Sequence, residues 1–96
     1  MSASKPFAEV RLADYLQSPG DVASYLNAAL EDGDERVLLA ALRNAAEAVG
    51  GMAEVARRSG LSRESLYRAL SEKGNPRWST LVAVLRALGV RVSIAA

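Results

Sequence analysis

The sequence contains no cysteine and no histidine, and its aromatic side chains are limited to one tryptophan, three tyrosines and one phenylalanine. Without cysteine, the chain can form neither a disulfide bond nor a thiolate metal site. Without histidine, it lacks the usual general base of enzymes and the commonest metal ligand. Serines are present, but we find no base placed to activate one of them as a nucleophile. We therefore expect a protein that is not an enzyme and that holds no metal or cofactor.

Long apolar stretches are also absent. The longest uninterrupted apolar run, residues 37–42, is far shorter than the roughly 20 residues needed to span a bilayer. The beginning of the chain, MSASKPFAEVRL, contains no apolar run resembling that of a secretory signal peptide. The acidic run at residues 31–35 lacks the alternating ligand spacing of a calcium-binding loop, and a turn between helices explains it better. We expect a cytoplasmic protein with no membrane association.

The net charge of +1 conceals a difference between the two halves of the chain. Residues 1–48 contain four basic and eight acidic side chains, a balance of −4, whereas residues 49–96 contain eight basic and three acidic side chains, a balance of +5. An acidic half and a basic half suggest two surfaces with two different partners. A scatter of solvating charges is the alternative interpretation, and the charge pattern alone does not decide between the two.

The first part of the chain is predicted to form an N-terminal arm, residues 1–17, followed by a single domain at 18–96. Within the arm, residues 8–12 alternate between apolar and charged side chains, as in a short strand. The first predicted helix has Ser18 as its N-cap and ends at Gly33. Its inward-facing stripe is predicted to contain Val22, Tyr25, Leu26, Ala29 and Leu30.

Three further helices are predicted in the middle of the chain. One extends from its N-cap Asp34 to about residue 48, and it is apolar most of the way round, which is typical of a helix buried between neighbours. After a Gly-Gly break, two short helices are predicted at 52–59 and 62–72. These two closely spaced short helices are the part of the chain from which a function can be predicted.

The C-terminal part is predicted to contain a last helix and a strand. Ser79 is expected to cap this helix and Gly89 to end it, with Trp78 packing inward as the hydrophobic residue that precedes the cap. Residues 90–96 alternate between apolar and polar side chains, which predicts a short C-terminal strand. Because a terminal strand without a neighbour is a pairing edge, this segment is a candidate for pairing across the two-fold axis of a dimer.

Residues 52–71 match the requirements of a helix-turn-helix motif. The first helix needs a small residue where the second crosses it, the turn needs a glycine that adopts a positive φ, and apolar residues must anchor the second helix to the core. The residues that meet these requirements are Ala56, Gly60, Leu61, Leu66 and Ala69. Ser62 is the predicted N-cap of the second helix.

The second helix of this motif is predicted to present a polar and basic face. Recognition helices place their N-terminal half in the major groove, where arginine can bind guanine bidentately and tyrosine can reach a base or a phosphate. The residues predicted to read bases are Ser62, Arg63, Tyr67, Arg68 and Ser71. Those predicted to contact the DNA backbone are Arg57, Arg58, Lys73 and Arg77. Helical hairpins with a glycine turn also occur in proteins that bind no DNA, so the motif is a hypothesis.

Residues 11–94 resemble a known family, most specifically in GLSRESLYRALSEKGNP and TLVAVLRALG. The family comprises the small addiction-module antidote proteins, HigA-like antitoxins with a Cro/repressor-type (XRE-like) helix-turn-helix. The resemblance implies a RelE/ParE-like toxin as partner, usually encoded beside the antitoxin, and autorepression of the shared operon. One position departs from the pattern: many phage-repressor relatives carry a phosphate-bracing glutamine where this chain has Ala53.

Together these observations predict an all-α, lambda-repressor-like helix-turn-helix bundle of about five helices with a short C-terminal β-strand. The predicted function is that of a DNA-binding antitoxin whose partners are operator double-stranded DNA and a cognate toxin. A homodimer is expected because a single helix-turn-helix reads only a few base pairs. The alternatives are a stand-alone repressor without a toxin and a protein-interaction module that no longer binds DNA.

Overall fold

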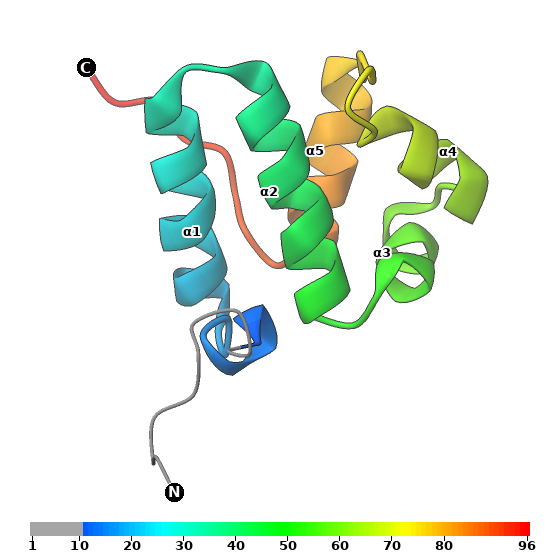
Figure 1. Ribbon diagram of the computed structural model, residues 1–96, viewed down its shortest axis with the longest axis horizontal. Helices are drawn as coiled ribbons and strands as arrows, with labels where there is room; N and C mark the ends of the chain where they lie inside the picture. The colour runs from blue at the N-terminus through cyan, green and yellow to red at the C-terminus, as the bar shows by residue number, and fades with distance from the viewer. Residues whose placement is uncertain (1–10) are drawn as a thin grey trace, which may run out of the picture.

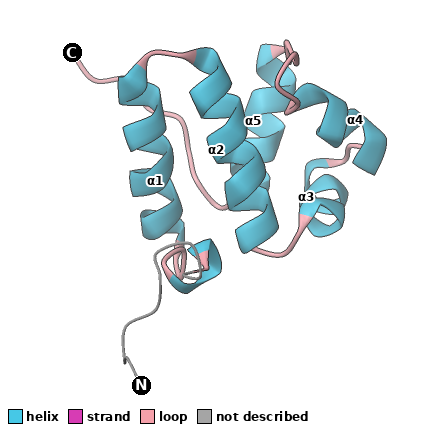
Figure 2. Cartoon of the chain, in the orientation of Figure 1, coloured by secondary structure: helices cyan, strands magenta, loops and turns pink. Residues whose placement is uncertain are grey.

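Five α-helices follow one another along residues 11–96, the part of the chain that the computed structural model describes (Figure 1). A short 3-10 helix precedes them, and the bounds are Leu12–Asp14 for this helix, Pro19–Asp32 for α1, Glu35–Ala48 for α2, Met52–Ser59 for α3, Arg63–Ala69 for α4 and Trp78–Ala87 for α5. The described residues contain helices and loops but no strand (Figure 2). The prediction of an all-α bundle of five helices is therefore confirmed.

Side-chain caps define the beginnings of α1 and α2. The hydroxyl of Ser18 accepts a hydrogen bond from the N–H of Asp21 at 3.1 Å, and the carboxylate of Asp21 accepts one from the N–H of Gln17 at 2.9 Å. The carboxylate of Asp34 accepts the N–H of Arg36 at 2.9 Å. Both predicted N-caps are confirmed, because each side chain satisfies a backbone donor that the first turn of a helix leaves without a partner.

The core forms around α2, which lies between α1 on one side and α3 and α5 on the other (Figure 1). Small side chains on α2 are fully buried and let its neighbours approach closely, among them Ala45 and Ala46. The short 3-10 helix also packs on α2, and Leu16 after it is buried in the same core. The central position predicted for α2 is confirmed.

Leu30, which the helical pattern places inward, is exposed, and so is the apolar Val37. Leu30, in the last turn of α1, has 57 % of its surface exposed, and Val37, in the first turn of α2, is also exposed. Both flank the turn between the two helices, where the bundle ends and no further helix covers them. The partly buried Tyr25 does pack against the core, and its hydroxyl accepts a hydrogen bond from the side chain of Asn44 at 3.4 Å.

The predicted C-terminal strand is wrong for this structure. Residues 90–96 are extended but belong to no strand, since the described chain offers no neighbouring strand with which a ladder could form. The N–H of Val90 bonds to the carbonyl of Leu85 at 3.0 Å, and Ile94 further along is 97 % exposed. Pairing of this segment across a two-fold axis stays a prediction. The strand predicted at residues 8–12 lies mostly outside the described residues, and its last residue begins the 3-10 helix.

The start of α5 also differs from the prediction. The helix begins at Trp78, with Arg77 as its N-cap, rather than after a cap at Ser79. Trp78 is therefore the first helical residue, and its side chain is 65 % exposed instead of packing inward. A hydrophobic staple requires the apolar residue to precede the N-cap, and the one-residue shift removes that arrangement.

Candidate DNA-binding surface

The turn between α3 and α4 is a tight connection made by a glycine. Gly60 adopts φ +76°, a left-handed conformation that side chains other than glycine rarely adopt. The N–H of Leu61 then reaches back to the carbonyl of Ala56 at 3.0 Å, which closes the end of α3. Ala56 is buried beneath this crossing, as its small size predicted.

Leucine side chains anchor α4 to the body of the protein. Leu66 in the middle of α4 and Leu70 at its C-cap are both completely buried. Leu61 is half-buried against the same core, and Ala69 is half-buried. The predicted structural residues of the motif therefore lie on the buried side of α3, in the turn and on the inner side of α4.

The second helix is shorter than predicted. The hydroxyl of Ser62 caps it by accepting the N–H of Ser65 at 3.0 Å, and the helix ends at Ala69 instead of extending to residue 72. Ser71 lies beyond this end, where its hydroxyl donates to the carbonyl of Arg68 at 2.9 Å. The segment after α4 approaches the end of the helix closely at Gly74, where a β-carbon would collide with the Ala69 carbonyl.

The outward side of α4 brings three of the predicted base-reading residues together. Arg63, Tyr67 and Arg68 are exposed within two turns of helix. The guanidinium carbon of Arg63 lies 5.9 Å from the centre of the Tyr67 ring, within the range of a cation–π contact. This contact restrains the arginine at the beginning of the helix, which is the end that a recognition helix places deepest in the groove.

Two of the predicted backbone-binding arginines are held by one carboxylate. Glu54 accepts hydrogen bonds from Arg57 at 3.0 and 2.6 Å and from Arg58 at 2.7 Å. These hydrogen bonds, the one from Arg57 first, lower the pKa of Glu54 to about 2. Glu54 is a residue that the prediction of the site missed, although its spacing of three and four positions from the arginines on a helix signals such pairing.

Glutamine at position 54 is expected to strengthen DNA binding up to about fivefold, since phosphate no longer has to displace a carboxylate from two arginines. Fluorescence anisotropy with a labelled duplex measures the change.

The depressed pKa also makes Glu54 stabilising above its ordinary pKa of 4.5, and this contribution is lost as the pH falls toward 2. The free energy of unfolding, measured with urea, should therefore fall more steeply for the wild type than for Glu54→Gln as the pH is lowered from 4.5 to 2. Equal affinities and parallel pH curves would contradict this role.

The remaining predicted backbone-binding residues lie after α4. Lys73 and Arg77 are exposed in the segment that joins α4 to α5, on either side of the turn at Gly74. The nine predicted contact residues thus come from α3, the turn, α4 and the segment after it, which are continuous in sequence. One further cation, Arg43 on α2, reaches this region although the sequence pattern did not indicate it.

The described residues contain no helix long and apolar enough to cross a membrane. Within residues 11–96 there is also no group of acidic side chains that could together hold a metal ion.

Comparison with known proteins identifies the chain by its relatives. Residues 6–96 match the family model described as "probable addiction module antidote protein". An uncharacterized protein of Haemophilus influenzae is 37 % identical over 83 residues, which cover 86 % of this chain and 84 % of the relative. No solved structure matches the chain. An antidote family implies a toxin partner and a role that is not enzymatic. With nearly its whole length matched, this chain belongs to the family of probable addiction module antidote proteins.

Proposed function

We propose that the protein is a sequence-specific DNA-binding antitoxin that represses its own operon and neutralises a RelE/ParE-like toxin by direct binding. The observation that carries the DNA-binding part is the set of exposed side chains on α4. Arg63, Tyr67 and Arg68 face outward from a helix whose inner side is fixed by fully buried leucines. In this proposal α4 lies in the major groove, where the arginines bind base edges.

Four cations supply the contacts to the DNA backbone in this proposal. Arg57 and Arg58 lie on α3, before α4 in the chain, and Lys73 and Arg77 lie in the segment after it. All four are exposed, and in this proposal each contacts a phosphate beside the groove that α4 enters. These contacts fix the position of the protein on the duplex without reading its sequence.

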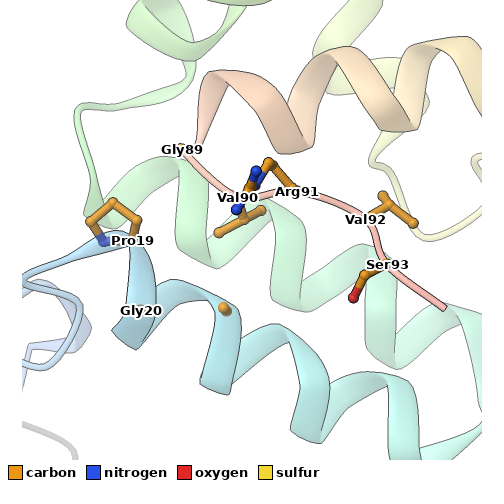
Figure 3. Close-up of a pocket in the computed structure, with 8 residues that line it drawn as sticks. Pro19, Gly20, Gly89, Val90, Arg91, Val92 and Ser93 are labelled. Atoms are coloured by element: carbon orange, nitrogen blue, oxygen red, sulfur yellow. The ribbon is translucent and has the colours of Figure 1, made fainter. Parts of the chain in front are cut away.

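The toxin is proposed to bind the opposite side of the molecule. The turn between α1 and α2 carries Glu31, Asp32 and Glu35, which form no ion pair within the described residues. Beside α1 runs a groove of about 590 Å³ whose other wall is residues 89–93 (Figure 3). An adjoining hollow of about 270 Å³ reaches Leu30 next to this acidic turn. The acidic turn complements a basic protein partner, and the neighbouring hollows, which Arg91 also lines, add apolar surface beside it.

This arrangement leaves the DNA-binding surface free when the toxin is bound. Helices α1 and α4 lie on opposite sides of α2 (Figure 1). We further propose that the protein binds DNA as a homodimer, because one helix-turn-helix reads only a few base pairs. Two-fold symmetry would place the half-sites about 34 Å apart, which is one turn of B-DNA.

The salt dependence of DNA binding tests the proposed backbone contacts. Four cations in each protomer of a dimer make about eight phosphate contacts, so that log K against log salt is expected to have a slope near −7. Arg58→Gln should reduce the magnitude of this slope by roughly 2, one contact for each protomer, and weaken specific and random DNA alike. Anisotropy titrations on the DNA upstream of the gene, at several salt concentrations, measure the slope. A slope near zero in the wild type would contradict the electrostatic part of the proposal.

A stand-alone repressor without a toxin is the nearest alternative function. A small basic toxin-like reading frame beside the gene favours the antitoxin, and the absence of any such frame favours the stand-alone repressor. A protein-interaction module that has lost DNA binding would give no specific DNA complex under any condition.

A further inference from the structure

One side chain connects the central helix to the end of α4. Arg43, on α2, is partly buried, and a guanidinium N–H donates a hydrogen bond to the carbonyl oxygen of Leu70, 27 residues later in the chain. Leu70 is the C-cap of α4, and its side chain is completely buried. In Figure 1, the C-terminal end of α4 is the end nearer the centre of the molecule, and the hydrogen bond places it against α2.

The carbonyl end of a short helix needs such a partner. The last carbonyl groups of any helix find no N–H partner within the helix itself, and they carry its partial negative charge. A guanidinium bound there forms a charge-assisted hydrogen bond, and its positive charge also interacts favourably with the partial negative charge of the helix end. Within residues 11–96, Arg43 provides the only side-chain hydrogen bond that joins α4 or its cap to another helix.

The contact fixes the orientation of α4 from its far end. At its beginning, α4 is held by the Gly60 turn, and in the middle by the buried Leu66. Arg43 adds a third point of attachment, two residues after Arg68. Helix α4 has only seven residues, so its C-cap, which both the buried Leu70 side chain and the Arg43 hydrogen bond hold, lies close to the exposed arginines.

We propose that Arg43 is a positioning residue for sequence recognition: by holding the Leu70 carbonyl, it sets the angle at which α4 presents Arg63 and Arg68 to the bases. This inference rests on the proposed DNA-binding function. In this proposal Arg43 acts through α4 and not through a contact with DNA: one of its guanidinium N–H groups is bound to a backbone carbonyl of the protein. It therefore affects specific binding more than random binding.

Arg43→Gln tests the proposal, with Arg36→Gln as the matched control. Arg36 lies on the same helix and loses the same charge, but it is exposed and its ion pair is with Asp34, at the N-cap of that helix. Arg43→Gln is expected to lower the affinity for the DNA upstream of the gene about tenfold, the effect expected when one base-reading arginine on α4 loses its contact. Its affinity for random DNA and its salt slope should match those of Arg36→Gln, because no phosphate contact is lost.

A second variant and a second measurement separate positioning from folding. Arg43→Lys retains a cation and a donor, so it should keep more of the specific affinity than the glutamine variant. In the free protein, hydrogen exchange at the α4 amides should be faster in Arg43→Gln than in Arg36→Gln, while exchange in α1 stays the same. This measurement needs no DNA, so it tests the contact even if the proposed DNA binding fails.

Several outcomes would overturn the proposal. Equal specific affinities and equal α4 exchange in Arg43→Gln and Arg36→Gln would show that the contact positions nothing. A smaller salt slope for Arg43→Gln than for Arg36→Gln would show that Arg43 binds phosphate directly. Parallel losses of specific and random binding, with faster exchange throughout the protein, would reduce its role to general stability.

Discussion

Replacement of Arg68 by alanine is expected to lower the affinity for operator DNA by about 1–3 kcal/mol, which is roughly ten- to a hundredfold, and to relax the preference for one base pair. Arg68 is exposed on α4, and no acidic side chain of the described residues forms an ion pair with it. Its guanidinium is therefore free to bind the acceptor pair of a guanine. Arg63→Ala is expected to have an effect of the same size.

Anisotropy titrations on operator DNA and on scrambled DNA of the same composition measure this prediction. Arg86→Ala is the matched control, because Arg86 is an exposed arginine in the last turn of α5, outside the proposed surface. The control should leave both affinities almost unchanged. If Arg68→Ala behaves like Arg86→Ala, the orientation proposed for α4 on DNA is wrong.

Leu66→Ala is expected to destabilise the protein by about 2–5 kcal/mol, the cost of deleting a fully buried leucine and leaving a cavity. Leu66 is completely buried, and it is the residue that holds the middle of α4 in the core. For a chain of this size, each kcal/mol corresponds to roughly 4–8 °C in Tm. The melting temperature should therefore fall by at least about 10 °C.

Thermal unfolding followed by circular dichroism gives this result directly. Glu64→Ala is the control on the same helix, since Glu64 is exposed and its loss should change stability by no more than about 0.5 kcal/mol. If Leu66→Ala unfolds at the temperature of Glu64→Ala, α4 does not pack on the core as described.

The features that the sequence predicted well depend on short-range chemistry. Ser18, Asp34 and Ser62 each cap a helix by bonding to a backbone N–H two or three residues ahead, so that neighbouring residues suffice to place them. Gly60 marks the turn for a similar reason, because its positive φ is a local requirement. Helix periodicity likewise placed Leu66 inside and Arg63 outside.

The features that the sequence missed depend on tertiary contacts. Leu30 follows the apolar stripe of α1, but nothing covers it at that end of the bundle, and periodicity does not show where a neighbour ends. The Arg43 contact joins residues 27 positions apart, and no local pattern connects them. The alternation of residues 90–96 is real, but a strand also requires a partner strand, which the described chain does not supply.

The central claim is that this chain recognises a DNA sequence, and a competition mobility shift tests it most directly. The purified protein is mixed with the DNA immediately upstream of its own gene, with an excess of random competitor, at two salt concentrations. The same lanes are repeated with the product of the neighbouring gene, in case the toxin acts as a co-repressor. We predict a discrete complex that resists the competitor and weakens at the higher salt concentration. If no competitor-resistant complex forms either with or without the neighbouring product, the protein is not a sequence-specific repressor.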